Sequence, residues 1–191
     1  MRIYEKIYIK IPREIDFKRL SRNKIMMLIY LLRNNKGGED ERERAYREFV
    51  SKIYRTNRVR AEQDRKEILS KYGVMIKRYR DLDKHTTTKK FDYNKIKVKT
   101  FNALCENKMT KSDLLVILWL LGPYQNNIHR VRTFKVIQLL TTIYGPSGYN
   151  KKSRLIESLE NILKIKYEDG TKLLVSYDIS GYYITLNLDP K

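Results

Sequence analysis

The chain has little of the chemistry that disulfides, metal sites and membrane spans require. Its single cysteine, Cys105, excludes an internal disulfide, and with only His85 and His129 beside it no Cys/His zinc site is expected. No phosphate loop of the form G-x-x-x-x-G-K-[ST] is present, which argues against an ATPase. The apolar runs 25–32 and 114–121 are too short to span a bilayer. We therefore expect no metal, no cofactor and no membrane partner.

Catalytic constellations are also scarce. Asp81 and Asp83 followed by Lys84 are similar to part of a metal-dependent nuclease site, but charge is ordinary at the turn expected there. His129-Arg130-Val131-Arg132 has the H-x-x-R form found in tyrosine recombinases. Such enzymes also need a preceding catalytic Arg, a second His or Trp and a late Tyr nucleophile, and the sequence has no convincing set. We expect a basic loop at this place, and no enzyme.

Positive charge is what the chain has in excess. It contains 41 Lys or Arg against 22 Asp or Glu, a formal net charge of +19. This balance predicts a polyanionic partner, most often nucleic acid, with an anionic membrane surface or the ribosome as the competitors. The start of the chain has no secretory signal pattern, so a cytoplasmic location, associated with the nucleoid or a plasmid, is expected.

A second positive feature is an internal repeat. Residues 21–32 align without a gap with 110–121: each segment begins with a hydroxyl residue and continues through polar positions into an apolar run. Further along, Ile53-Tyr54 recurs as Ile143-Tyr144. A period of about 90 residues is typical of two copies of a small domain and not of a solenoid.

Hydrophobic periodicity, capping residues and turn residues predict the elements of each copy. Ser21 and Thr110 are expected N-caps of the first helices, Thr133 is expected to cap the second helix of the second copy, and Gly73 is expected to end the third helix of the first. The first copy is predicted to have a strand over 3–11, helices over 21–33, 39–54 and 58–72, and strands over 74–79 and 93–98. The second is predicted to have helices over 110–121, 133–144 and 150–163, then strands over 165–167, 172–177 and 182–186.

Strand, three helices and a β-hairpin is the order of the winged-helix superfamily, which both copies resemble. The expected fold class is mostly α with small β-hairpin wings (α+β), as two winged helix-turn-helix domains in tandem. They are placed at 1–98 and 109–191, with a linker at 99–108. More loosely, a tandem pair in a small basic protein resembles the replication initiators of plasmids and phages, and 20–32 is similar in style to their first helix. That resemblance implies binding to repeated origin sequences.

The third helix of each copy is the candidate recognition helix, since the second helix of a helix-turn-helix enters the major groove. Arg suits guanine edges and Asn or Gln suits adenine edges. The start of the first recognition helix is expected to present Asn57, Arg58, Arg60, Gln63 and Asp64. The remaining candidate contacts of the first copy are Arg42, Arg44, Arg47 and the wing residues Lys84, Lys89 and Lys90. Those of the second copy are Arg130, Arg132, Tyr149, Asn150, Lys151, Lys152, Arg154 and the wing residue Lys172.

These features predict a non-catalytic, sequence-specific protein that binds double-stranded DNA at repeated sites, such as a replication origin of a plasmid or phage. Two alternatives stay open: a transcriptional regulator that acts by occupying an operator, and a DNA-segregation adaptor that recruits a filament or motor. RNA binding is less favoured, because no aromatic stacking signature is visible. The sequence leaves open whether the chain forms a homodimer or binds a replication or segregation partner protein.

Overall fold

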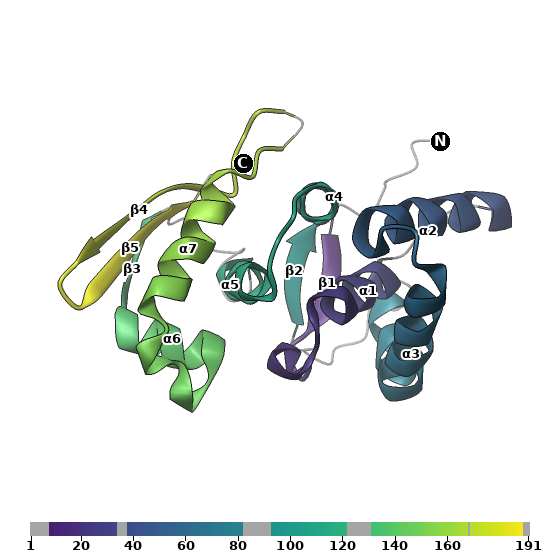
Figure 1. Cartoon of the computed structure of the whole chain (residues 1–191), viewed down its shortest axis with the longest axis horizontal. Coiled ribbons are helices and arrows are strands. Elements are labelled where there is room, and N and C mark those ends of the chain that lie inside the picture. The colour runs from purple at the N-terminus through teal and green to yellow at the C-terminus, as the bar shows by residue number, and fades with distance from the viewer. Residues whose placement is uncertain (1–7, 34–37, 82–92, 122–130, 168, 189–191) are drawn as a thin grey trace. The chain divides into compact units, whose positions relative to one another are not determined.

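The protein is described by a computed structural model that covers residues 8–33, 38–81, 93–121, 131–167 and 169–188 (Figure 1). Within these ranges the chain is mostly helical with small antiparallel sheets, which is the α+β class. It divides into two compact units. The N-terminal unit comprises Met1–Asp16 with Leu20–Glu106, and the C-terminal unit comprises Phe17–Arg19 with Asn107–Lys191. No described helix combines the length and the apolar character that crossing a membrane requires.

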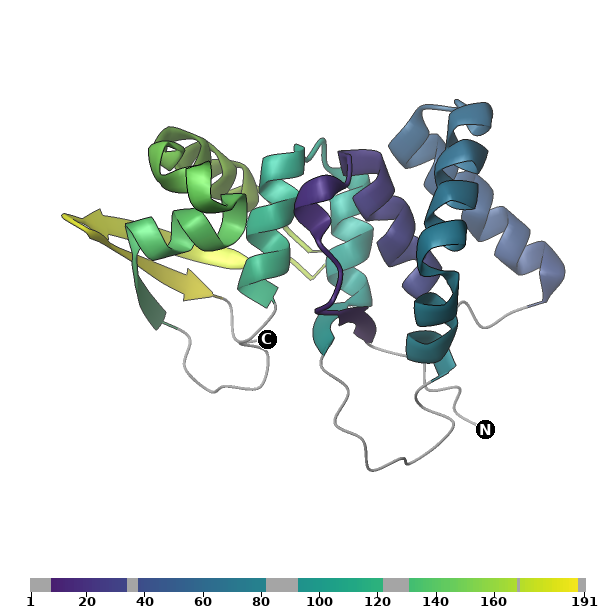
Figure 2. The same ribbon diagram turned by 90° about the horizontal axis from the view of Figure 1, so that it is seen from below.

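The N-terminal unit is built around a buried helix. Its elements are β1 (Tyr8–Pro12), α1 (Arg22–Leu32), α2 (Glu39–Tyr54), α3 (Arg58–Asp81), β2 (Tyr93–Lys97) and α4 (Val98–Glu106). Every residue of α1 from Ile25 to Ile29 is fully buried, because α3 covers one side of this helix and β1 and α2 pack on others. Helices α1 and α3 lie side by side in both views (Figure 1, Figure 2). The strands β1 and β2 form an antiparallel pair, with Ile9 opposite Ile96.

The first two helices follow the predicted signals. Ser21 caps α1, since its hydroxyl accepts a hydrogen bond from the Lys24 amide at 3.3 Å. Helix α2 begins at Glu39 with three acidic residues in its first turn, where the positive end of the helix dipole stabilises them. Phe49 then joins the core, where its ring stacks on Tyr30 at 4.4 Å between centroids. The predicted ranges of both helices are therefore confirmed to within a residue or two.

The third helix differs from its prediction. The expected end at Tyr72 and the strand over 74–79 are wrong, because α3 continues as a helix through Gly73 to Asp81. Ile68, Ile76 and Tyr79 are buried at helical spacing along it, so tertiary packing outweighs the local preference of glycine and valine for another conformation. In consequence β2 pairs with β1 and not with residues 74–79. The expected wing tip around Lys84 lies outside the described residues.

The segment predicted to be the linker is mostly a helix. Residues 98–106 form α4, which buries Phe101 and Leu104 and packs on α2 and β2. Phe101 also stacks on Phe49, with 6.2 Å between the ring centroids. Two apolar residues three positions apart place one face of a short helix against the core. Most of the expected linker at 99–108 therefore belongs to the N-terminal unit, whose boundary follows Glu106.

The C-terminal unit combines helices with a three-stranded antiparallel sheet. Its elements are α5 (Lys111–Leu121), β3 (Val131–Lys135), α6 (Val136–Tyr144), the 3-10 helix η2 (Pro146–Asn150), α7 (Lys152–Leu163), β4 (Leu174–Ser180) and β5 (Tyr183–Leu188), together with the short 3-10 helix η1 (Phe17–Arg19). The strand order is β3-β5-β4. Ile184 and Leu186 of the central strand are buried, as are Leu159 and Ile162 of α7. Helix α7 packs on α5 and on β4.

Two local expectations for this unit are resolved by its hydrogen bonds. Thr110 does cap α5: its hydroxyl accepts from the Asp113 amide at 3.2 Å, and the Asp113 carboxylate accepts from the Thr110 amide at 2.7 Å. Thr133 does not cap a helix, because it lies in β3, where its hydroxyl meets that of Thr185 at 2.9 Å. Pairing with β5 holds residues 131–135 extended, and α6 begins only at Val136.

The hairpin of the C-terminal unit lies later in the chain than the proposed wing residue Lys172. Strands β4 and β5 form an antiparallel hairpin, in which Ser180 lies opposite Tyr183. The pairing expected between 165–167 and 172–177 is reduced to a single bridge between Lys166 and Lys172. Gly181 takes a φ of +58° at the turn, which glycine adopts without steric cost. Lys172 is therefore not at the tip of the long hairpin, and Tyr182 takes that place.

Candidate nucleic-acid interface

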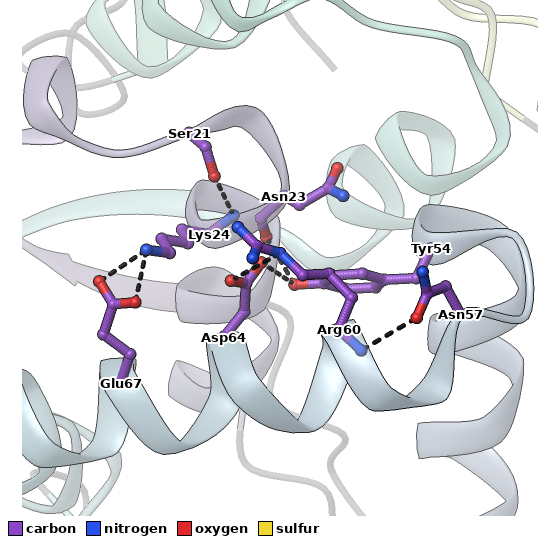
Figure 3. A network of polar contacts seen from close by, with 8 residues as sticks. All are labelled: Ser21, Asn23, Lys24, Tyr54, Asn57, Arg60, Asp64 and Glu67. Atoms are coloured by element: carbon purple, nitrogen blue, oxygen red, sulfur yellow. Dashed lines mark hydrogen bonds and ion pairs between the residues drawn. The ribbon is translucent and has the colours of Figure 1, made fainter.

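The inner face of α3 is fixed by a network of polar contacts centred on Tyr54 (Figure 3). Tyr54 is the last residue of α2, and its hydroxyl lies 3.1 Å from Asp64 Oδ2 and 3.3 Å from the carbonyl oxygen of Asn23. Asp64 is 2% exposed, and its other oxygen, Oδ1, lies 3.5 Å from Arg60 Nε. Burial is the main reason that the pKa of the Tyr54 hydroxyl is raised, and the neighbouring Asp64 carboxylate raises it further. Three helices therefore meet at one buried carboxylate.

A second contact ties α3 to α1 at the edge of this network. Lys24 Nζ donates to both carboxylate oxygens of Glu67 at 2.6 Å (Figure 3). This bond favours the ionised carboxylate and lowers the pKa of Glu67. Because Glu67 lies three residues beyond Asp64, the two anchors follow each other along the same side of α3.

The third helix of the C-terminal unit is anchored at equivalent positions. The Tyr144 hydroxyl, at the end of α6, lies 2.7 Å from Ser112 Oγ. Ser158 Oγ donates a hydrogen bond to Ser112 Oγ at 2.9 Å. Asn161 Nδ2 donates to Asp113 Oδ2 at 3.4 Å. In the alignment of the repeat Ser112 and Asp113 match Asn23 and Lys24. Ser158 and Asn161 are the seventh and tenth residues of α7, as Asp64 and Glu67 are of α3. Both units thus hold the third helix at the same two positions, although Asp64 contacts Tyr54 directly and Ser158 reaches Tyr144 through Ser112.

The outer face of α3 carries a row of exposed side chains, and the exposed carboxylate beside them, Glu67, is paired with Lys24. Its members recur at intervals of three or four residues, so they share one face of the helix. We call this row the outer stripe, and it consists of Val59, Gln63, Lys66, Ser70 and Val74. Val59 and Val74 are 71% and 81% exposed, although neither has a folding reason to face solvent. An amide suits the edge of adenine and an isopropyl group suits the methyl of thymine, so these groups match what the major groove displays.

Of the residues predicted to read bases in the first copy, Gln63 alone lies on the outer stripe. Asn57 Oδ1 accepts from the Arg60 amide at 3.0 Å, which caps the start of α3. Arg58 Nη2 lies 3.2 Å from Glu43 Oε1, while Arg60 faces Asp64. The expectation that Asp64 is presented at the surface is wrong, because its carboxylate is buried under the helix.

The arginines predicted on the preceding helix are exposed. Arg42, Arg44 and Arg47 all lie on α2, and Arg47 Nε pairs with Glu43 Oε1 at 3.0 Å. Glu43 therefore accepts from arginines of both α2 and α3, which ties the two helices together at their exposed edge. The predicted contacts Lys84, Lys89, Lys90 and Arg130 lie outside the described residues, and Arg132 is located in β3 without a described side chain.

The second half of α3 is a basic surface that the sequence reasoning missed. Lys71, Lys77 and Arg78 are exposed on it, and no acidic residue occurs between Ile68 and Tyr79. None of these three cations forms an ion pair with the described residues. Sequence reasoning also missed Val59, Lys66 and Ser70, because it selected residues by charge and by distance from the helix start. The helical spacing of the buried positions would have identified both groups.

Five of the predicted contacts of the second copy lie in η2 or at the start of α7. Tyr149 and Asn150 lie exposed in η2, and Lys152 and Arg154 are exposed at the start of α7. Lys151 Nζ lies 5.6 Å from the centre of the Tyr144 ring. These five residues are neighbours in the chain, whereas Lys172 lies beside the isolated bridge to Lys166.

The outer face of α7 also differs in its charge. The positions equivalent to Val59, Gln63 and Lys66, counted from the helix start, are occupied by Ser153, Glu157 and Glu160. All three are exposed. Glu160 accepts a hydrogen bond from the Tyr177 hydroxyl, and this bond raises the pKa of Tyr177 to about 12. Two carboxylates on this face oppose close approach to phosphates.

The described residues contain no group of three or more His, Cys, Asp or Glu side chains that could hold a metal ion. Burial raises the pKa of Cys105 to about 12, which keeps its thiol protonated at neutral pH. What the geometry does offer is an anchored helix with an exposed outer face, beside which the Glu67 carboxylate is paired with Lys24. Comparisons of the chain with protein-family models, with curated proteins and with solved structures returned no match.

Proposed function

We propose that the protein is a non-catalytic, sequence-specific binder of double-stranded DNA, and that α3 is its recognition helix. The observation that carries the proposal is the outer stripe: an amide, a hydroxyl, an ammonium and two isopropyl groups stand on one exposed face, and the carboxylate of the neighbouring Glu67 is paired with Lys24. Amide and methyl contacts to base edges discriminate sequence, whereas an ammonium contributes affinity through the phosphates.

The anchoring of α3 supports this role. A helix that reads bases must present its side chains in a fixed position, since a loosely held site loses its precision. Tyr54 holds α3 from α2 through the buried Asp64, and Lys24 holds it from α1 through the exposed Glu67. The side chains of the outer stripe take no part in these two contacts, so the contacts do not compete with the groove for them.

The length of α3 gives its two halves different tasks. Its 24 residues span about 36 Å at a rise of 1.5 Å per residue, whereas the major groove is about 12 Å wide. A straight helix of this length leaves the groove and crosses the DNA backbone. In our proposal Val59, Gln63 and Lys66 lie in the groove, and Lys77 and Arg78 meet phosphates beyond it.

We also propose that the two units are helix-turn-helix domains in tandem, and that the C-terminal one is a winged helix. Its succession of helix, strand, two helices and hairpin, with β3 beside β5, supports this assignment. There Lys152 and Arg154 approach phosphates from the start of α7. Two units in one chain suit paired half-sites, such as repeats at the replication origin of a plasmid or phage, which is the biological setting that we favour. An operator or a segregation site is the alternative.

Selection of bound duplexes from a random library, at two salt concentrations, tests the function. We expect an enriched motif, with two half-sites about one helical turn apart if both units bind the same face of the duplex. Gln63→Ala should relax the preference at one base pair of one half-site. Gln138→Ala, at an exposed glutamine of α6, is the matched control and should leave the motif unchanged. Selection without enrichment, and binding that collapses as salt rises, would contradict the proposal and indicate a backbone binder.

A further inference from the structure

The buried carboxylate below α3 is placed between a phenol and an exposed guanidinium. Asp64 Oδ2 is 3.1 Å from the Tyr54 hydroxyl, and Asp64 Oδ1 is 3.5 Å from Arg60 Nε (Figure 3). The Arg60 side chain is 55% exposed, whereas Asp64 is nearly inaccessible. The carboxylate therefore contacts Arg60 at Nε, on the buried side of the guanidinium. The terminal Nη groups of Arg60 stay available to solvent.

This arrangement suits the recognition of guanine. Guanine shows two acceptors, O6 and N7, in the major groove, and an arginine bonds both with a pair of parallel N–H donors. A guanidinium that is held at Nε before it binds loses less side-chain freedom in the complex. It also has fewer orientations in which to accept another base. Restraint by Asp64 should therefore increase discrimination between bases more than it increases affinity.

A comparison with the C-terminal unit separates this role from simple anchoring. Ser158 occupies the position of Asp64 and completes the network around Tyr144 with a neutral hydroxyl. A carboxylate is thus not needed at this position of the third helix. Arg154, at the position of Arg60, has no carboxylate partner among the described residues. Negative charge at Asp64 repels the phosphates of a bound duplex, so its presence under a recognition helix calls for a reason other than helix anchoring.

We propose that Asp64 is a positioning residue that directs Arg60 to a guanine, so that the half-site bound by the N-terminal unit contains a G·C pair read by Arg60. This inference rests on the proposed function, because it assumes that α3 lies in the major groove. It assigns the two arginines different tasks: Arg60 specifies a base, and Arg154 contributes affinity without strong preference.

The test is a double-mutant cycle on the selected duplex. Discrimination is measured as the ratio of Kd values for the selected duplex and for duplexes with each G·C pair replaced by A·T. Arg60→Ala should reduce this ratio at one pair by about 5- to 150-fold. Asp64→Ser, which introduces the residue of the other unit, should reduce it several-fold at the same pair. It should leave binding to random duplex unchanged or tighter, because a negative charge is lost. In the Arg60→Ala background, Asp64→Ser should have no further effect on the ratio.

Two results would overturn the inference while leaving the proposed function intact. One is a loss of affinity for all duplexes alike on Asp64→Ser, and the other is an effect of Asp64→Ser that persists without Arg60. If Asp64→Ser does not fold, Asp64→Asn replaces it, since its amide oxygen still accepts from Tyr54 while the charge is gone. The same loss of discrimination is expected of that variant, and unchanged discrimination would reject the proposal. Failure of the proposed function is recognised separately, because the wild-type chain then selects no motif at all.

Discussion

The third helices of the two units have similar anchoring contacts on the inner face but different residues on the exposed face. Each is linked to a tyrosine at the end of the second helix and to the first turn of the first helix. Asp64 accepts from Tyr54 directly, whereas Ser158 reaches Tyr144 through Ser112. Outward, α3 carries the outer stripe, beside which Glu67 is paired with Lys24, and extends over 24 residues. Helix α7 has 12 residues and exposes Glu157 and Glu160. Anchoring and recognition are therefore separable properties of this helix: the inner face can stay the same while the outer face serves another purpose.

The distribution of charge follows the same division. About two thirds of the lysines and arginines belong to the N-terminal unit. The β4–β5 hairpin of the C-terminal unit has no Lys or Arg from Leu173 to Leu188, and its turn exposes Tyr182 to 87%. A hairpin of this composition adds no attraction to phosphates by charge. We therefore expect the N-terminal unit to supply most of the affinity for DNA.

The largest effect on DNA binding is expected when the exposed residues of α3 are replaced by those at the matching positions of α7. The triple substitution Val59→Ser, Gln63→Glu and Lys66→Glu introduces the residues found at the matching positions. We expect binding to the selected duplex to weaken by about 2–4 kcal/mol, through lost base contacts and carboxylates brought near phosphates. Fluorescence anisotropy measures the Kd, and thermal unfolding should be nearly unchanged because all three positions are exposed. Unaltered affinity would show that α3 does not enter the groove.

Removing one tyrosine hydroxyl from each unit tests how much the anchoring hydrogen bonds contribute to stability. Tyr54→Phe removes a donor to a buried carboxylate and should lower the free energy of unfolding of the N-terminal unit by about 1.5–3 kcal/mol. Tyr144→Phe should cost about 0.5–1.5 kcal/mol, since Ser112 keeps its bond from Ser158 and all the groups involved are neutral.

Each unit has its own reporter for this measurement. The single tryptophan, Trp119, lies in the C-terminal unit, so its fluorescence in urea follows that unit. The single cysteine, Cys105, lies in the N-terminal unit, where its raised pKa slows reaction with thiol reagents until the unit opens. Equal losses for the two variants would contradict the view that charge distinguishes the two networks.

Local signals were sufficient to predict the first helices. Ser21 and Thr110 are capping residues followed by apolar runs, and both cap as expected. The extent of α3 was not predictable in this way, because Gly73 and the residues after it favour an extended segment locally. The helix continues because Ile76 and Tyr79 are buried against other parts of the unit. Such tertiary contacts are not visible in the local sequence.

The candidate site shows a similar limit. Charge at the start of the third helices identified Arg58 and Arg60, but the sequence pattern did not reveal that Glu43 and Asp64 engage them. Glu43 lies on another helix, so its contact depends on how α2 packs. The pair Arg60–Asp64 is spaced by four residues, so the helical spacing alone could have predicted this contact. The apolar member Val59 was missed, because an exposed valine becomes informative only once its exposure is known.

The smallest expected effect compares one lysine from each third helix. Lys77→Ala removes an exposed charge from the second half of α3, and Lys152→Ala removes one from the start of α7. If Lys77 meets a phosphate, its loss should weaken binding to all duplexes alike and lower the slope of log Kd against log salt by about one ion. Lys152→Ala should lower that slope by less, because Glu157 and Glu160 keep the face of α7 away from close contact. A larger change for Lys152 than for Lys77 would reverse the roles assigned to the two helices.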